Sequence, residues 1–320
     1  MIRCPLNTGL PIPFLQHLWH LFLAATQQRR WRRPRCDLSI GPHSRPYALG
    51  MPELPEVETT RLALSTQLIG RRITAVTIRQ PRLRWPIPEE IETFLLGQTI
   101  LDLRRRAKYL LLDVSDGSAL LHLGMSGCLR ILPQNFPLGL HDHVDITLDS
   151  KKVLRFTDPR RFGCLVWQRM GVTHPLLQNL GPEPLTPEFS GGYLYERSRK
   201  RTISVKTFLM NQAIVVGVGN IYAAETLFRS GIAPGRRAGS ISKIRFTRLA
   251  EAVKDILTSA VASGGTTLRD FKNPDGMPGY FKQELLVYGR QGLPCQACGQ
   301  NLRGNRLGQR STVWCAHCQR

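Results

Sequence analysis

The apolar residues follow two different periods along residues 51–320. From Pro55 they recur at helical spacing until Gly70, so the pattern predicts an opening helix with Pro55 at its first position. After Gly70, apolar and polar residues alternate as in half-buried strands. Six such stretches follow, at 71–79, 108–114, 118–132, 143–149, 152–158 and 161–167. The pattern therefore predicts a mostly antiparallel β unit, opened by a helix, up to about residue 180.

A proline-rich stretch, residues 180–192, separates this β unit from a helical one. Beyond it, residues 220–231 and 247–265 place their apolar side chains on one helix face. Gly231 and Gly264 stand where each of these helices should stop. The predicted fold class is α+β, with the strands in the N-terminal part and the helices in the C-terminal part.

The net charge of the chain is +21, which is high for its length of 320 residues. Residues 51–320 alone hold 37 basic and 22 acidic residues, a net charge of +15. A surface this basic favours polyanionic partners, first of all nucleic acid, although an acidic protein or an anionic membrane surface stays open. No stretch approaches the roughly 18 to 20 apolar residues of a membrane span, so we expect a soluble protein.

Residues 1–50 differ in composition from the rest, with seven arginines and one acid, Asp37. Transit peptides have such a charge pattern, but this segment lacks their serine content and carries helix-breaking prolines, among them Pro5, Pro11, Pro13 and Pro34. Upstream codons read from a misplaced start explain it at least as well. We expect the segment to be absent from the working protein, by misassigned initiation or by removal, and not to act as an organellar signal.

Four cysteines near the C-terminus have the spacing of a zinc site. Each C-x2-C pair forms one knuckle, and sixteen residues separate the pairs, which are Cys295, Cys298, Cys315 and Cys318. Four thiolates complete a tetrahedral zinc site with no open position, which predicts one structural zinc ion. Coincidental cysteines or a redox pair are the alternatives. Arginines between the knuckles, including Arg310, could make this hairpin a phosphate binder.

Two turns carry side chains that packing alone explains poorly. In "TDPRRFG", residues 157–163, Arg160, Arg161 and Phe162 stand at an expected loop tip and could wedge between bases of a duplex. The alternative is a surface turn whose Phe162 folds back into the core, and this stretch by itself favours that alternative. Met125, in the glycine-flanked turn "HLGMSG", is by itself more often a core residue.

Two glycine-rich segments follow in the helical part. In "VVGVGN", Asn220 stands at the expected helix cap, and the glycines would let the backbone approach a phosphate closely. The glycines and prolines of residues 264–281 predict a long loop, and a loop of this length is expected to be a functional lid or a linker. Its aromatic residues, among them Tyr280, argue against simple disorder.

These motifs together resemble one family. Eight of them stand in the order found in formamidopyrimidine-DNA glycosylases, bacterial enzymes that remove oxidised purines: MPELPEVET, RRAKYLL, HLGMSG, DPRRFG, GVGNIYA, GGTTLRDF with DGMPGYF, VYGR and the four cysteines. The resemblance covers residues 51–320 and none of residues 1–50. It implies an N-terminal antiparallel β-sandwich domain (51–182), a helix-two-turn-helix domain with a lesion-capping loop (183–290) and a zinc finger (291–320).

The resemblance also implies an activity. Members of this family cleave the N-glycosidic bond with the amine of an N-terminal proline and then nick the strand by β- and δ-elimination, and Pro52 matches this nucleophile. A proline inside a chain has its nitrogen in a tertiary amide, so Pro52 is inert while it is joined to Met51. The implied enzyme is a cytoplasmic monomer that acts on duplex DNA and needs no redox or nucleotide cofactor.

Four further residues match catalytic positions of the family. Glu53 matches the proton donor to the opening sugar, and Glu56 a supporting carboxylate. Lys108 matches a phosphate-contacting lysine that serves as proton donor in β-elimination. Arg310 matches the corresponding arginine of δ-elimination. Without the resemblance, Glu56 could simply complement the helix dipole and Lys108 could be a strand-edge charge.

Other residues match DNA contacts. The matched positions are Met125, His141, Arg160, Phe162, Asn220 and Tyr280. Within this set, Met125, Arg160 and Phe162 would fill the hole that an extruded nucleotide leaves, since extrusion costs a few kcal/mol. The resemblance thus predicts that Phe162 is an exposed plug rather than a core residue. The loop at 264–281 would cover the flipped base.

Two alternatives stay open. Glycosylases of the endonuclease VIII branch share the architecture but act on oxidised pyrimidines. They typically have glycine where Leu54 stands and lack the 264–281 loop, so both features favour the purine enzyme. The other alternative is a non-catalytic zinc-ribbon DNA-binding protein, which applies if residues 1–50 are retained and Pro52 never gains a free amine.

Overall fold

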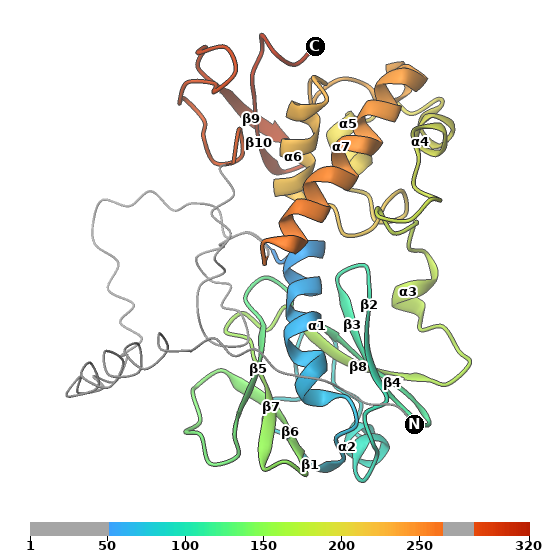
Figure 1. Cartoon of the computed structure of the whole chain (residues 1–320), viewed down its shortest axis with the longest axis vertical. Helices are drawn as coiled ribbons and strands as arrows, with labels where there is room; N and C mark the ends of the chain where they lie inside the picture. Colours follow the sequence, from blue (N-terminus) through green and yellow to red (C-terminus); the bar gives the residue numbers. More distant parts are fainter. Residues whose placement is uncertain (1–50, 265–284) are drawn as a thin grey trace, which may run out of the picture. The chain divides into compact units, whose positions relative to one another are not determined.

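The opening helix of the β half is α1 (Leu54–Leu68) in the computed structural model of the chain, which describes residues 51–264 and 285–320 (Figure 1). It begins one residue earlier than predicted, so Pro55 takes the second helical position rather than the first. Glu53 is the N-cap residue, and its amide donates to the Glu56 carboxylate at 2.9 Å. Gly70 follows the helix at φ +80°, a conformation that glycine adopts without strain.

Eight strands form two four-stranded antiparallel sheets. The first sheet has the order β1 (Ile73–Ile78), β6 (Asp142–Leu148), β7 (Lys152–Thr157) and β5 (Cys128–Pro133). The second has the order β2 (Asp102–Arg106), β3 (Tyr109–Val114), β4 (Gly117–His122) and β8 (Cys164–Arg169). The stretch 118–132, predicted as one element, divides into β4 and β5. The arginine-rich β2 was not predicted, and neither was the short α2 (Ile91–Leu95).

One hydrophobic core joins the two sheets and α1. It includes Leu64 of α1, Leu112 and Leu121 of the second sheet, and Ile146 and Phe156 of the first, each at most 2% exposed. Apolar side chains packed between two sheets are the arrangement of a β-sandwich. The predicted antiparallel β-sandwich opened by a helix is therefore confirmed.

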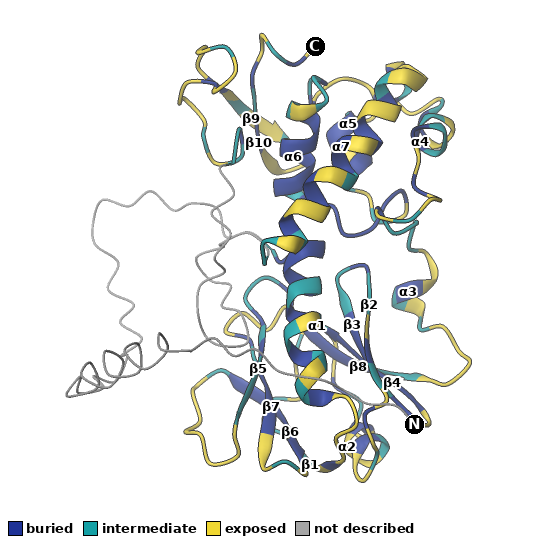
Figure 2. Cartoon of the chain, viewed as in Figure 1, coloured by how far each residue is buried: buried dark blue, intermediate teal, exposed yellow. Residues whose placement is uncertain are grey.

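The helical half has its own core. Its helices are α3 (Pro175–Gln178), α4 (Gly191–Ser198), α5 (Val205–Leu209), α6 (Asn220–Arg229) and α7 (Lys243–Ala262), with the short 3-10 turn η1 (Ala238–Ser240). Figure 2 shows buried residues along one side of α7 and exposed residues along the other, as an amphipathic helix requires. Gly231 and Gly264 follow α6 and α7 at positive φ, as predicted.

The last element is a two-stranded hairpin, β9 (Arg303–Leu307) with β10 (Arg310–Trp314). Gly308 and Gln309 join the strands with φ of +54° and +62°, the geometry of a tight hairpin turn. Leu302 and Val313 of this segment pack against Ala224 of α6. The hairpin is thereby attached to the helix whose amino end faces the β half.

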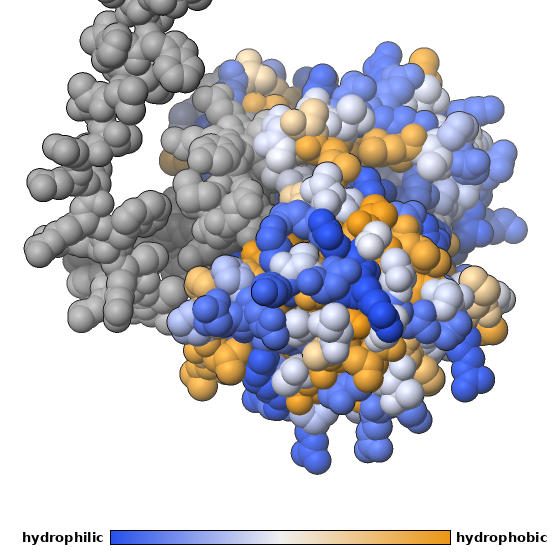
Figure 3. Space-filling model, turned by 60° about the horizontal axis from the view of Figure 1, so that its bottom comes forward, coloured by the Kyte–Doolittle hydropathy of each residue, from blue (hydrophilic) through white to orange (hydrophobic). Residues whose placement is uncertain are grey.

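One end of the β half presents both polar and apolar side chains to the surface. Figure 3 shows hydrophilic side chains spread over the end that carries β1 and α2, with separate hydrophobic patches between them. Across the described ranges, 51–264 and 285–320, every helix is too short or too polar to cross a membrane.

Candidate functional site

The carboxylate of Glu53 lies against the amino end of α6. It accepts hydrogen bonds from the amides of Gly219 at 2.6 Å and Ile221 at 2.9 Å, and a longer one from Tyr222 at 3.4 Å. Amides in the first turn of a helix have no carbonyl partner in their own helix, and the helix dipole favours negative charge there. A residue of the β half therefore completes the start of a helix in the helical half.

The glycines before α6 make this approach possible. A Cβ atom on Gly219 would lie 2.4 Å from Glu53 Oε1, and one on Gly217 would lie 2.6 Å from Leu54 Cβ. The sequence suggested that these glycines let backbone approach a phosphate, but here they admit residues 53 and 54. The prediction that Asn220 caps the helix is wrong: Gly219 is the N-cap and Asn220 the first helical residue, because the Glu53 carboxylate receives the free amides.

Glu53 is 2% exposed, and this burial raises its pKa. The positive charge of Lys108 opposes the rise in pKa, the negative charge of Glu56 adds to it, and the two amides of α6 oppose it. Burial favours the neutral, protonated form of a carboxyl group. Glu53 is thus suited to carry a proton at a pH where an exposed glutamate would have lost it.

Glu56 lies next to Glu53 and contacts both its backbone and α6. It is fully buried, and its carboxylate accepts from the Glu53 amide at 2.9 Å and from the Tyr222 hydroxyl at 2.9 Å. The structural interpretation of Glu56 is thus supported, because its side chain caps α1, and its supporting role in catalysis stays a prediction.

Pro52 is buried directly before Glu53, at the entrance to α1. Its nitrogen belongs to the Met51–Pro52 peptide bond in the 320-residue chain. The candidate nucleophile and the candidate acid are thus consecutive residues in one buried segment.

Lys108 and Arg310 approach this segment from two other elements. Lys108 lies in the two-residue turn between β2 and β3, and Arg310 begins β10. Burial lowers the pKa of Lys108, the nearby charges of Glu53 and Glu56 oppose this, and the charge of Arg310 reinforces it. The structure thus brings the four ionisable residues predicted to be catalytic into one electrostatic neighbourhood.

The turns "HLGMSG" and "DPRRFG" pack together around Asp158. This buried carboxylate accepts from the Ser126 hydroxyl at 2.7 Å and from the Gly163 amide at 2.8 Å. A Cβ atom on Gly124 would lie 2.5 Å from the backbone of Phe162, so the two turns touch through backbone. The Asp158 amide donates to the carbonyl of His141, which brings that residue to the same loop cluster.

The side chains of this loop cluster point outward. Phe162 is 44% exposed, and the Arg160 guanidinium lies over its ring at 4.9 Å from the centroid. Arg161 is exposed as well, whereas Met125 and His141 are half-buried. The interpretation of Phe162 as a core residue is wrong, and its predicted exposure at the loop tip is confirmed.

Asn220 lies at the start of α6, close to Tyr288. Burial raises the pKa of the Tyr288 phenol, and a hydrogen bond with the Asn220 side chain opposes that rise. Tyr280 and the loop predicted as a lid lie outside the described residues, apart from Gly264 at its start. Their predicted contacts therefore stay predictions.

The four cysteines of the C-terminal hairpin converge. Their sulfur atoms all lie within 4.8 Å of one another, with Cys295 and Cys318 at 4.0 Å and Cys298 and Cys315 at 3.4 Å. Four thiolates about 2.3 Å from one zinc ion would be about 3.8 Å apart in a tetrahedron. The four thiols thus fit a single structural zinc ion, as predicted.

The sequence did not single out Lys206, which the structure places beside the site. Lys206 on α5 is 1% exposed, and its ammonium donates to the Ser311 carbonyl and the Thr312 hydroxyl, each at 2.9 Å. Burial lowers its pKa to about 8, the charge of Glu53 opposes this, and the charge of Arg310 adds to it. A lysine among the apolar residues Val205 and Phe208 of "SVKTFLM" was the available signal.

Comparisons with known families cover nearly all of residues 51–320. Residues 51–165 match the formamidopyrimidine-DNA glycosylase N-terminal domain and residues 180–272 the H2TH domain of the same family. Residues 292–320 match the zinc finger found in FPG and IleRS.

Individual proteins match along the same length. A formamidopyrimidine-DNA glycosylase of Stenotrophomonas maltophilia (strain K279a) is 65% identical over 270 residues, which are 84% of this chain and 100% of that protein. The crystal structure of the MutM (Fpg) protein from Thermus thermophilus superposes with a TM-score of 0.76 at 38% identity, covering 84% of this chain and 98% of that one.

Two matching structures contain DNA. A point mutant of the Lactococcus lactis FPG, in complex with Fapy-dG DNA, has a TM-score of 0.79 at 31% identity and covers 84% of this chain and 100% of that one. Lactococcus lactis Fpg in complex with abasic-site DNA has a TM-score of 0.77 at 31% identity, covering 84% and 99%.

Proposed function

The chain belongs to the formamidopyrimidine-DNA glycosylase family, and on that premise we propose how its own residues carry out the reaction. It is a DNA glycosylase with AP lyase activity that acts on oxidised purines and abasic sites in DNA. One observation carries the assignment of residues. Pro52 and Glu53 are consecutive and buried, and the Glu53 carboxylate lies on the amino end of α6 with Lys108 nearby.

Pro52 is the proposed nucleophile. Its secondary amine attacks C1′ of the damaged nucleotide, the C1′–N bond to the base breaks, and the base departs with that electron pair and a proton. Opening of the sugar then leaves an iminium between Pro52 and C1′. The iminium withdraws electrons and makes the C2′ proton acidic, so that the 3′ phosphate and then the 5′ phosphate are eliminated.

Glu53 is the proposed proton donor to the opening sugar. Burial favours its protonated form, and the amides of Gly219 and Ile221 stabilise the carboxylate once the proton has left. The same side chain can therefore give up a proton and take one back. Glu56 supports it by fixing the Glu53 backbone and, through Tyr222, the position of α6.

Lys108 and Arg310 are the proposed cations of the elimination steps. Each would hold a phosphate next to the lesion and supply a proton to the departing group, Lys108 in β-elimination and Arg310 in δ-elimination. Burial already lowers the pKa of Lys108, which makes its proton easier to transfer. Asn220, His141 and Tyr280 are proposed as further contacts to the DNA backbone.

Met125, Arg160 and Phe162 are the proposed plug. The exposed Phe162 ring with the Arg160 guanidinium over it offers an apolar wedge and a cation at one loop tip. Such a wedge compensates for the stacking that is lost when a nucleotide swings out of the duplex. The zinc ion, bound by the four cysteines, would hold β9 and β10 so that Arg310 faces the DNA.

Separate hydrophobic cores in the β half and in the helical half support the proposed domains 51–182 and 183–290. Residues 291–320 are proposed as a third domain because their four cysteines converge, although their apolar side chains share a cluster with Ala224 and Val287 of the helical domain. The substrate is chromosomal duplex DNA, and the relatives are bacterial, so the cytoplasm is the proposed compartment.

The mechanism makes one strict demand on the chain: Pro52 must carry a free amine. We therefore propose that the active form begins at Pro52, after initiation at Met51 and removal of that methionine, or after cleavage of residues 1–51. The experiment compares proteins that start at Met1 and at Met51, each incubated with duplex containing 8-oxoguanine opposite cytosine and with borohydride.

The Met51 form, with Pro52 verified as its first residue, should give a covalent adduct with the DNA, and the Met1 form should give none. Pro52→Gly in the Met51 form retains an N-terminal amine and tests whether proline itself is required. If the verified Pro52 form gives no adduct, the mechanism proposed here is wrong.

A further inference from the structure

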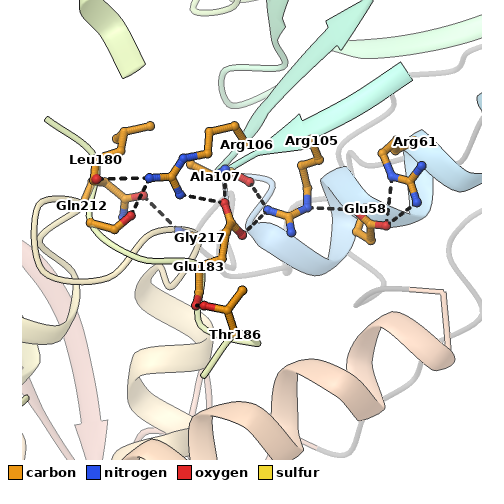
Figure 4. A network of polar contacts seen from close by, with 11 residues as sticks. Glu58, Arg61, Arg105, Arg106, Ala107, Leu180, Glu183, Thr186, Gln212 and Gly217 are labelled. Atoms are coloured by element: carbon orange, nitrogen blue, oxygen red, sulfur yellow. Dashed lines mark hydrogen bonds and ion pairs between the residues drawn. The ribbon is translucent and has the colours of Figure 1, made fainter. Parts of the chain in front are cut away.

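Glu183 is the centre of a polar network between the β2–β3 turn and the segment that leads into the helical half (Figure 4). Its Oε1 accepts from the Ala107 amide at 2.7 Å and from Arg106 Nη1 at 2.9 Å. Its Oε2 accepts from Arg105 Nη1 at 2.7 Å. With its side chain 18% exposed, this carboxylate is held largely by protein donors rather than by water.

The backbone that Glu183 contacts is in an unfavourable conformation. Ala107 has φ +56°, in the left-handed region that side chains with a Cβ atom rarely adopt. Its amide is bound by Glu183, and its carbonyl accepts from Arg105 Nη1 at 2.9 Å. Both polar groups of Ala107 are therefore fixed by the network. The next residue in the chain is Lys108.

The network continues to the residue that follows the candidate proton donor. Arg106 Nη2 donates to the Gly181 carbonyl at 2.6 Å, and the Gly181 amide donates to the Gln212 carbonyl at 2.8 Å. The Gln212 side chain accepts from the Gly217 amide at 3.0 Å, and the Gly217 carbonyl accepts from the Leu54 amide at 3.0 Å. A continuous set of hydrogen bonds thus links the Lys108 turn to residue 54.

A second arm reaches α1 directly. Arg105 Nε donates to Glu58 at 2.8 Å, and Glu58 also accepts from Arg61 Nη2 at 2.7 Å. The Lys108 turn is consequently fixed against the helix that begins at Leu54 as well as against the helical half. The same network therefore contacts the turn that carries Lys108 and the helix that Glu53 caps.

We propose that Glu183 is a positioning residue for the reaction, which holds the strained Ala107 turn so that the Lys108 ammonium faces Glu53. The inference rests on the proposed function of Lys108 and Glu53. If Glu183 only stabilised the contact between the β half and the helical half, its hydrogen bonds with Arg105 and Arg106 would be sufficient. Glu183 also binds the amide of Ala107, which has a positive φ and directly precedes Lys108. This hydrogen bond is the reason to connect Glu183 with the position of Lys108.

The test uses the form of the protein that traps the borohydride adduct. Glu183→Gln replaces one acceptor oxygen by a donor that faces an arginine or the Ala107 amide. We expect the single-turnover rate of strand cleavage at an abasic site to fall at least tenfold. Affinity for a duplex with a stable abasic analogue should change less than twofold. Glu188→Gln, an exposed glutamate in the same segment, is the matched control and should keep the parent rate.

A double-mutant cycle separates positioning from general support of the fold. Glu183→Gln is made again in a Lys108→Met background, where it should cause no further loss of rate because the residue it positions is gone. Fully additive losses, or a Glu183→Gln rate equal to that of Glu188→Gln, would overturn the proposal. Since the unmutated form still traps the adduct in either case, the proposed function would stand.

Glu183→Asp provides a second variant in case Glu183→Gln does not fold. It keeps the negative charge beside Arg105 and Arg106, but its shorter side chain withdraws the carboxylate from the Ala107 amide. We expect a folded protein with a rate at least threefold lower, and again no added loss in the Lys108→Met background. A parent-like rate for Glu183→Asp would count against the proposal.

Discussion

The Gly219 amide and the Glu53 carboxylate are 2.6 Å apart, although 166 residues separate them in the chain. This contact joins the residue that caps α1 to the residue that caps α6. It places a buried acid where the amides of a helix start can stabilise its charged form. The position of Glu53, the proposed proton donor, thus depends on how closely the β half approaches the helical half.

Gly219→Ala should inactivate the enzyme while leaving most of the fold intact. A Cβ atom at this position would lie 2.3 Å from Glu53 Cδ, so the carboxylate must move away from α6. A displacement of about 1 Å in an active site can lower a rate about 100-fold, and we expect a loss of that order in single-turnover base excision. Gly192→Ala is the control, because its nearest neighbour would be 3.8 Å away. Parent-like excision by Gly219→Ala would contradict the assigned role of this contact.

The pH dependence of base excision should report Glu53. Its pKa is raised by burial, so the protonated donor should persist above the usual range of glutamates, and excision should decline as the pH rises through the raised value. The positive charge of Lys108 lowers the pKa of Glu53, whereas the negative charge of Glu56 raises it. The charge of Glu53 in turn acts on Lys206, whose pKa it raises, and on the phenol of Tyr288, whose pKa it also raises.

Lys108→Met should therefore move this alkaline limb to higher pH, because the positive charge that opposes the rise in pKa has been removed. The measurement is the single-turnover excision rate of 8-oxoguanine between about pH 5 and 9, for the parent and for Lys108→Met. Glu53→Gln should lower excision about 100-fold or more and abolish the limb. An unshifted limb in Lys108→Met would show that another group titrates.

Local patterns and long-range contacts differ in how far the sequence reveals them. The zinc site was predictable because two ligands at a time lie three residues apart. Most strands were predictable from the alternation of apolar and polar residues, whereas the arginine-rich β2 was not. The position of Glu53 against the start of α6 was not predictable from the sequence, because no local pattern indicates a partner 166 residues away. For the same reason the sequence suggested that Asn220 caps α6. In the structure the Glu53 carboxylate accepts the hydrogen bonds of the free amides, so the helix needs no cap from Asn220.

Polar residues held by several protein partners were the other feature that the sequence did not reveal. Lys206 and Glu183 stand in segments that look like ordinary helix and linker, and their importance comes from what surrounds them. An unpaired buried charge would destabilise the fold. A charged residue that the structure shows away from water with defined partners is therefore a candidate for a specific role.

Lys206 should make stability depend on pH in the alkaline range. Its pKa is lowered to about 8 in the folded protein from an ordinary value of 10.5. Between these values the unfolded chain binds the proton and the folded chain does not, so stability contributed by this group rises as the pH increases from about 8 to about 10.5. The melting temperature of the parent should rise relative to that of Lys206→Met across this window. An equal pH dependence in both proteins would argue against burial of the neutral amine.

Phe162→Ala should weaken binding to damaged DNA without destabilising the protein. The ring is 44% exposed, so its removal leaves little cavity, and the melting temperature should stay within about 2 °C of the parent value. Stacking of an aromatic side chain on a base contributes about 1 to 3 kcal/mol, which predicts roughly tenfold weaker binding to a duplex with an abasic analogue. Undamaged duplex should bind the variant and the parent equally, because no nucleotide has left the stack.

Met170→Ala is the control for this prediction. It removes another exposed apolar side chain, 69% exposed at the opposite end of β8, and should bind both duplexes as the parent does. Equal losses on damaged and undamaged DNA would mean that Phe162 contributes general contact instead of filling the vacated position.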